Sequence, residues 1–173
     1  MKILGLPGIR PATFQWMQKL IAALDLGQTE ISVQQYRCWS GGPGAQLNLN
    51  EEAAFAARGN PDLVIAKSVG TRVALHAYVN RLLLADSYIF LGTPVNNFAG
   101  KEIESLKYMC NAARILLIQQ KQDPTGDFMK LSSCLPIAPL CVHTEIPGND
   151  HAYANTPLLK QLVESWYVVP TTR

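Results

Sequence analysis

Short runs of apolar and β-branched residues alternate along the chain with segments whose apolar positions recur at helical spacing. Each run has the length of about 4 to 7 residues that is typical of strands in a parallel sheet. The runs predict six strands, at residues 2–6, 30–36, 63–66, 87–91, 115–119 and 139–144. The alternation therefore predicts strand–helix–strand units.

The segments between these strands carry helix signals. Phe14, Met17, Ile21 and Leu24 share one helical face, and Gly27 follows them as a predicted C-cap. Further helices are expected after an Asn50 N-cap, along the stripe that contains Ile103 and Leu106, and from Thr156-Pro157 onward.

Right-handed crossovers in such a chain place helices on both faces of the sheet. The prediction is an α/β fold, a three-layer α/β/α sandwich with a six-stranded, mostly parallel sheet. A chain of 173 residues has the length of one domain, so residues 1–173 are expected to form a single domain. Ligands of open parallel sheets bind beyond the carboxyl ends of the strands, where strand order reverses.

Composition and charge exclude several classes of protein. The chain has fifteen Lys and Arg and thirteen Asp and Glu, and its basic residues form no run, which argues against a nucleic-acid partner. No stretch approaches the roughly 18 to 20 apolar residues of a membrane span, and residues 1–7 are too short for a signal peptide. A cytoplasmic protein is expected. Its four cysteines have no CxxC spacing, and reduced, mostly buried thiols are expected at Cys38, Cys110, Cys134 and Cys141.

Ser68 follows the third predicted strand at a strand-to-helix junction. Ala66 and Gly70 stand two residues before and after it, as the tight turn of a nucleophile elbow requires. In such a turn the serine hydroxyl points away from the sheet, and the Val69 N–H at the helix start faces the reacting carbonyl. The alternative reading of Ser68 is an ordinary helix cap.

A nucleophilic serine needs a base, and the chain has three histidines. His76 lies two helical turns beyond Ser68 and points away from it, and His143 lies within a strand, where packing is the expected role. His151 follows the last strand in a loop of Pro, Gly and Asn, from which it can reach Ser68. A solvent-exposed loop histidine is the alternative.

A third group must orient the histidine, and Asp123 follows the fifth strand. Asp123-Pro124 also has the signature of an Asx turn, and Asp123 can both start that turn and orient the histidine. Asp127 is expected to cap the next short helix. Asp150 is too close to His151 in sequence to reach its ring.

The order Ser68, Asp123, His151, with Ala66-Lys67-Ser68-Val69-Gly70 after a strand, resembles the α/β-hydrolase superfamily. The segments Lys67-Ser68-x-Gly70-x-Arg72-x-Ala74-Leu75 and Gly148-Asn-Asp-His151 are similar to small, cap-less, dienelactone-hydrolase-like serine hydrolases. The resemblance implies strand order 2-1-3-4-5-6 and a hydrolase that cleaves a small ester or thioester through a Ser-His-Asp triad, without a cofactor or metal.

The resemblance also implies an oxyanion loop after the first strand, where Leu6-Pro7-Gly8-Ile9 stands. The backbone N–H of Ile9 would then be the second oxyanion donor beside that of Val69. Proline replaces the usual histidine at position 7, and Ala66 replaces the commoner glycine. The connection 92–114 holds one helix and no lid.

Two other functions remain open. The first is a non-catalytic binding module of the same fold, and the second is a nucleotide-binding domain that uses Gly5-x-x-Gly8 or the 41–44 loop. Neither glycine segment matches GxGxxG or a P-loop, so a flexible connector is the expected role of the 41–44 loop. Lys67 and Arg72 are expected to pair with surface acids or to favour anionic substrates, and Cys141-x-His143 is not a usual metal-ligand spacing. The acyl and alcohol groups of the substrate and the oligomeric state do not follow from the sequence.

Overall fold

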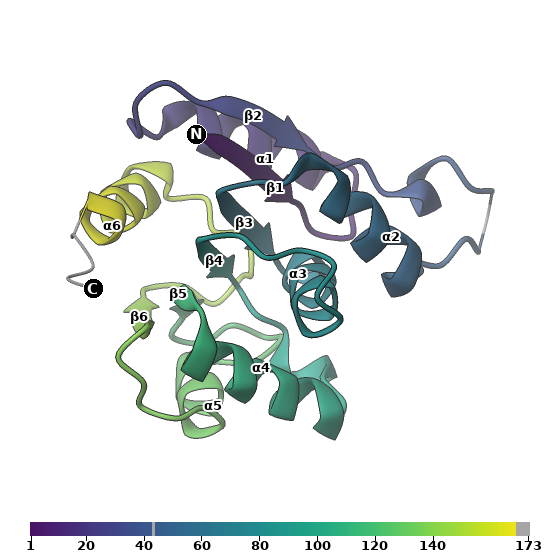
Figure 1. Cartoon of the computed structure of the whole chain (residues 1–173). Helices are drawn as coiled ribbons and strands as arrows, with labels where there is room; N and C mark the ends of the chain where they lie inside the picture. Colours follow the sequence, from purple (N-terminus) through teal and green to yellow (C-terminus); the bar gives the residue numbers. More distant parts are fainter. Residues whose placement is uncertain (43, 169–173) are drawn as a thin grey trace.

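The fold is a six-stranded sheet in which every neighbouring pair is parallel and the order is β2-β1-β3-β4-β5-β6 (Figure 1). It is seen in a computed structural model that describes residues 1–42 and 44–168. The strands are β1 (Lys2–Leu6), β2 (Glu30–Val33), β3 (Leu63–Lys67), β4 (Ser87–Leu91), β5 (Arg114–Gln120) and β6 (Cys141–Ile146). The predicted fold class and strand order are confirmed.

Helices cover both faces of the sheet (Figure 1). They are α1 (Ala12–Ala23), α2 (Leu49–Ala56), α3 (Val69–Val79), α4 (Gly100–Ala112), α5 (Phe128–Ser133) and α6 (Thr156–Val168), with short 3-10 turns η1 (Arg37–Trp39), η2 (Ala57–Gly59) and η3 (Val95–Asn97). One apolar core joins α1 and α6 to the sheet, and a second joins α2, α3, α4 and α5 to its other face. The layers are therefore helix, sheet and helix.

The ends of several strands differ from the prediction. β2 ends at Val33 rather than at residue 36: the Gln34 N–H still donates to the Gly5 carbonyl (2.9 Å), but the chain then leaves β1 and enters η1, where Arg37 N–H donates to the Glu52 carboxylate (2.8 Å). β6 begins at Cys141 rather than at residue 139. Pro139 has no N–H to donate, and Cys141 N–H closes a turn onto the Ala138 carbonyl (3.0 Å).

Helix caps also differ from the sequence reading. The side chain of Asn48, not Asn50, accepts from the first N–H groups of α2, and Asn155 precedes α6 and accepts from Leu158 N–H (3.1 Å). Each segment has two candidate capping residues close together in sequence, and the backbone path decides which of them caps the helix. α1 ends at Ala23, before Gly27, while Asp127 caps α5 as predicted.

The start of α3 packs unusually close to the end of β1. A side-chain Cβ at Gly70 would overlap the carbonyl groups of Leu6 and Pro7, far inside van der Waals contact. Glycine is thus required at position 70 by space, although the residue lies inside a helix. The same approach brings the loop after β1 beside the turn at Ser68.

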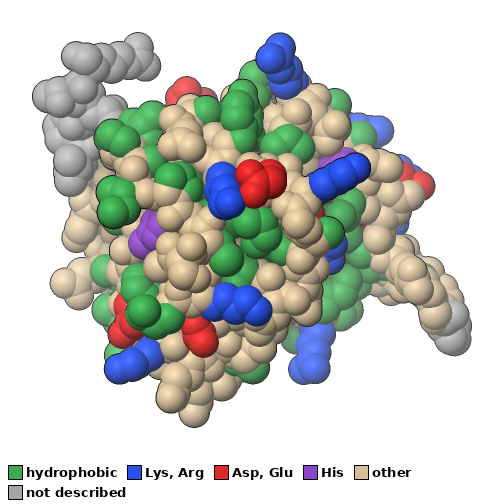
Figure 2. Space-filling view, turned by 90° about the horizontal axis from the view of Figure 1, so that it is seen from below, with side chains coloured by type: hydrophobic (Ala, Val, Ile, Leu, Met, Phe, Trp, Pro, Cys, Tyr) green, Lys and Arg blue, Asp and Glu red, His purple; other side chains and the backbone are tan. Residues whose placement is uncertain are grey.

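On the face shown in Figure 2, Lys and Arg side chains stand apart from one another, and some lie against an acid. Within residues 1–42 and 44–168, no helix is both long and apolar enough to cross a bilayer.

We expect Gly70→Ala to lower the free energy of unfolding by about 3 kcal/mol or more, because the added methyl must displace backbone rather than a flexible side chain. Urea unfolding measures the loss. Gly59→Ala is the matched control, since a Cβ at Gly59 meets nothing within 4 Å, and its effect should stay within about 0.5 kcal/mol. Equal effects of the two substitutions would contradict the packing argument.

Candidate active site

Ser68 stands at the sharp turn between β3 and α3 in a strained backbone conformation, with φ of 53° and ψ of −121°. Its N–H continues the ladder to β4 by donating to the Leu91 carbonyl (2.9 Å). The Thr71 N–H and hydroxyl both donate to its carbonyl, at 2.9 and 2.7 Å. The side chain makes no cap hydrogen bond to α3, so the hydroxyl is left for another partner.

That partner is His151, whose Nε2 lies 2.9 Å from Ser68 Oγ. The opposite ring nitrogen, Nδ1, lies 2.8 and 3.0 Å from the two carboxylate oxygens of Asp123. An ionised carboxylate only accepts hydrogen bonds, so Nδ1 carries the proton and donates it to Asp123. Nε2 is then the acceptor of the Ser68 hydroxyl proton. Loops after β3, β5 and β6 bring the three side chains together at the carboxyl edge of the sheet.

Asp123 is buried and stays in its ionised form. Burial acts to raise the pKa of its carboxyl, but hydrogen bonds from His151 and Thr125 outweigh burial and hold that pKa below its ordinary value. Thr125 donates twice to Oδ1, from its N–H and its hydroxyl, at 2.8 Å each. The first of these bonds closes the expected Asx turn, so Asp123 both shapes its loop and holds the imidazole.

Tyr153 is the third donor to Asp123 and was not singled out from the sequence. Its ring is 1% exposed, and its hydroxyl donates to Asp123 Oδ2 (2.9 Å) while accepting from Gln120 N–H (2.9 Å). Burial and the Asp123 charge both raise the pKa of the phenol, so it remains a donor. The ring also meets the His151 ring edge to face, with centroids 5.9 Å apart. A buried tyrosine two residues after a histidine gives no recognisable signal in the sequence.

The loop that carries His151 is fixed by the side chain of Gln120 at the end of β5. Gln120 Oε1 accepts from the N–H groups of Asp150 and His151, at 3.2 and 2.9 Å, and its amide donates to Asp150 Oδ1 (2.9 Å). Gly148, with φ of 144°, leaves no room for a side chain beside Gln120. These bonds hold His151 in its left-handed conformation, with φ of 58°.

Gln119 does the same for the loop that carries Asp123. This buried amide accepts from Thr93 N–H (2.8 Å) and donates to the Gly126 carbonyl. It therefore ties the loop after β5 to the loop after β4. The two consecutive glutamines point to opposite sides of the strand and serve neighbouring loops.

Lys67 lies under the histidine loop, which corrects the expectation that it pairs with surface acids. It is 4% exposed, and its ammonium donates to the His151 carbonyl (2.9 Å) and sits over the rings of Trp16 and Tyr153, at 5.5 and 5.4 Å. Burial lowers the pKa of Lys67 to about 8, against the opposing influence of Asp123. The Lys67 side chain thus links the end of β3, next to Ser68, to the backbone of His151.

The two predicted oxyanion donors belong to residues on the two segments that meet at Ser68. Val69 N–H opens α3, and Ile9 follows Gly8, where a Cβ would lie 3.6 Å from Ser68 Cβ. Neither N–H donates to an acceptor in the described part of the chain. Hydrogen bonds fix the loop, since Tyr36 hydroxyl donates to the Pro7 carbonyl (2.7 Å) and Trp39 indole to the Ile9 carbonyl (2.6 Å).

The other chemistry-bearing residues lie away from this group. His76 contacts the Asn50 side chain (2.6 Å), and Arg72 forms an ion pair with Glu102 (2.7 Å). His143 lies beside Cys141 on β6, as discussed below. In the 41–44 loop, Pro43 lies outside the described residues.

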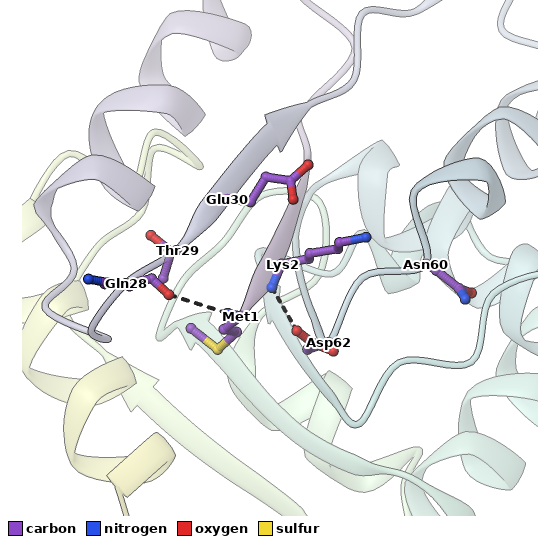
Figure 3. A pocket seen from close by; sticks show the side chains of 7 residues that line it. All are labelled: Met1, Lys2, Gln28, Thr29, Glu30, Asn60 and Asp62. Carbon is purple, nitrogen blue, oxygen red and sulfur yellow. Dashed lines mark hydrogen bonds between the residues drawn. The ribbon is translucent and has the colours of Figure 1, made fainter.

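A hollow of about 550 Å³ lies at the opposite edge of the sheet (Figure 3). It is lined at the amino ends of β1, β2 and β3 by Met1, Lys2, Gln28, Thr29, Glu30, Asn60 and Asp62. Asp62 there accepts from Lys2 N–H, and the N-terminal amine donates to the Gln28 carbonyl (Figure 3). These contacts tie the strand starts together and place none of the side chains near Ser68.

No protein-family model matches the sequence, and no curated protein sequence matches it significantly. Solved structures do match the fold. An uncharacterized protein from Bacillus cereus ATCC 10987 aligns with 96% of this chain at TM-score 0.63 and 16% identity, and this chain spans 60% of that protein's length.

Two further structures match over most of both chains. A protein from Agrobacterium vitis S4 described as a "Putative hydrolase" aligns with 95% of this chain and 87% of its own at TM-score 0.61 and 16% identity. The type II thioesterase YbtT of the yersiniabactin pathway aligns with 96% of this chain and 88% of its own at TM-score 0.50 and 15% identity. With its parallel sheet in the order 2-1-3-4-5-6, the chain has an α/β-hydrolase-like fold.

Proposed function

We propose that this chain is a serine hydrolase that cleaves small esters or thioesters. The observation that carries the proposal is the continuous contact from the Asp123 carboxylate through the His151 ring to the Ser68 hydroxyl, at 2.8 and 2.9 Å. A hydroxyl is a weak nucleophile until a neighbouring base removes its proton, and this arrangement supplies the base and the group that orients it. The names of two structural neighbours, a hydrolase and a thioesterase, agree with this chemistry.

In the first half of the reaction, Ser68 Oγ attacks the substrate carbonyl carbon and its proton passes to His151 Nε2. The carbonyl oxygen becomes an oxyanion, which accepts hydrogen bonds from the N–H groups of Val69 and Ile9. Asp123 stabilises the imidazolium that forms. His151 then returns the proton to the leaving alkoxide or thiolate, and the acyl group stays on Ser68.

In the second half, His151 takes a proton from water, and the hydroxide attacks the acyl carbon. The same donors bind the second oxyanion. As this intermediate collapses, the bond from the acyl carbon to Ser68 Oγ breaks and His151 gives its proton to Oγ, which releases the carboxylic acid and restores the Ser68 hydroxyl. The strained Ser68 backbone supports both steps because it holds Oγ in one position while the bonds around it change.

Lys67 acts in this proposal as a positioning residue. It does not reach the Ser68 hydroxyl, but its bond to the His151 carbonyl anchors the loop from which the imidazole extends. Burying a charged lysine destabilises the fold, and the lowered pKa of Lys67 reflects that cost. A residue that destabilises the fold in this way is expected to serve the site, and here it holds the His151 loop.

We expect a fluorophosphonate probe to label the wild type at Ser68, with loss of fluoride and formation of a phosphorus–oxygen bond, and to leave Ser68→Ala unlabelled. Hydrolysis of p-nitrophenyl acetate by Ser68→Ala should fall at least about a thousandfold in kcat. Ser133→Ala, on the exposed face of α5, is the control and should retain labelling and rate. A folded wild type that neither reacts nor hydrolyses would favour a non-catalytic binding module.

Asp123→Asn should lower kcat by about 10⁴-fold because the amide can donate to Nδ1 and so reverses the imidazole tautomer. The matched control is Asp127→Asn, which changes the same side chain at the cap of α5 and should leave kcat within about twofold. Kinetics with p-nitrophenyl acetate, with circular dichroism to verify folding, compare the two. A similar loss in both variants would argue against a special role of Asp123.

Lys67→Met should lower kcat by about 10- to 100-fold, because the His151 loop loses its anchor, and should change KM little. Lys107→Met, on the surface of α4, is the control. An unchanged kcat, or a loss confined to KM, would contradict the positioning role.

The stability of Lys67→Met gives a separate prediction. Lys67 titrates near pH 8 in the fold and near pH 10.4 when unfolded, so between these values the unfolded chain binds more protons. Wild-type stability should therefore rise relative to the variant by about 3 kcal/mol from pH 7 to 10.5, and urea unfolding at both pH values measures it. A pH-independent difference would show that Lys67 has an ordinary pKa.

A further inference from the structure

A second group of chemistry-bearing side chains lies at the other end of the sheet and takes no part in the proposed hydrolysis. Cys110 is in the last turn of α4, Cys141 is the first residue of β6, and His143 follows two residues later. The sulfur atoms and a ring nitrogen of these residues all lie within 4.8 Å of one another, and Cys141 Sγ is 3.3 Å from His143 Nε2. We propose that Cys110, Cys141 and His143 bind a zinc ion.

The fold explains why these three side chains converge. Residues 141 and 143 are two positions apart on β6 and therefore present their side chains to the same face of the sheet. α4 covers that face, and Cys110 belongs with Cys141 to the same apolar core. The Cys141 N–H is fixed by the Ala138 carbonyl, and Ile115 N–H donates to the Leu140 carbonyl (2.8 Å). The ligands are thus mounted on a helix and on a fixed strand start.

The separations suit a tetrahedral metal. Zinc bonds of about 2.3 Å to sulfur and 2.0 to 2.1 Å to nitrogen place tetrahedral ligand atoms about 3.5 to 3.8 Å apart. Cys141 Sγ and His143 Nε2 are 3.3 Å apart, and no pair of the three ligand atoms is more than 4.8 Å apart, so small side-chain rotations complete the site. Cys110 and Cys141 are buried and His143 is partly exposed, which leaves a side open for a water molecule as fourth ligand.

The donor set selects the kind of ion. Two thiolates and an imidazole suit zinc, whereas magnesium and calcium prefer oxygen ligands. Two thiolates also balance the charge of a divalent ion, which suits a site in an apolar core. Cys141 pairs with Ile115 at the amino ends of β6 and β5, while Asp123 and His151 follow the carboxyl ends of those strands. The ion would therefore join α4 to the edge strand and would not act on the ester.

The test is a titration of the reduced, full chain with Co²⁺ followed by Zn²⁺, without any activity assay. We expect a thiolate-to-cobalt charge-transfer band with the visible bands of tetrahedral cobalt, and we expect stoichiometric Zn²⁺ to remove both. Zinc should also raise the thermal unfolding midpoint, because the ion binds only the folded arrangement.

Variants identify the ligands. Cys110→Ser, Cys141→Ser and His143→Gln should each weaken zinc binding by more than about tenfold, and the two serine variants should each reduce the charge-transfer band. Cys134→Ser and His76→Gln are the controls and should bind as the wild type does. His143 is partly exposed, so His143→Gln keeps the test valid if a cysteine variant fails to fold. A folded, reduced wild type that shows no charge-transfer band at micromolar metal overturns the proposal, as does equal zinc binding by all five variants.

Discussion

The close approach of the start of α3 to the end of β1 is the constraint on which the candidate site depends. Gly70 lies so near the carbonyl groups of Leu6 and Pro7 that no side chain fits between them. This contact fixes the direction in which the chain leaves β3 and so sets the strained turn at Ser68. It also places the loop with Gly8 and Ile9 beside that turn, so that a single packing contact brings the two segments together.

Buried polar side chains position the other two members of the group. Gln119, Gln120, Tyr153 and Lys67 are all nearly inaccessible, and each binds backbone or a carboxylate in the loops that carry Asp123 and His151. Buried polar groups are stable only when their hydrogen bonds are made, so such a network permits few loop conformations. These hydrogen bonds therefore restrict the loops that carry Asp123 and His151.

The two edges of the sheet carry different chemistry. At the carboxyl edge, acid, imidazole and hydroxyl form a continuous hydrogen-bonded chain. Near the amino end of β6, two thiols and an imidazole gather against the core. This division follows from the parallel topology, because every strand ends at one edge and starts at the other.

Local pattern predicted the six strands, their parallel direction and the positions of Ser68, Asp123 and His151 after strand ends, because burial and turn chemistry act between near neighbours in sequence. The order of the strands came from the resemblance to a known superfamily and not from the pattern. A helix cap differed from the prediction where two nearby residues could serve, as at Asn48 and Asn50. Only the tertiary structure decided the roles of Lys67, Gln120 and Tyr153 and the meeting of Cys110 with Cys141 and His143. These contacts join residues about 30 to 80 positions apart, and side-chain packing between distant segments leaves no periodic mark on the sequence.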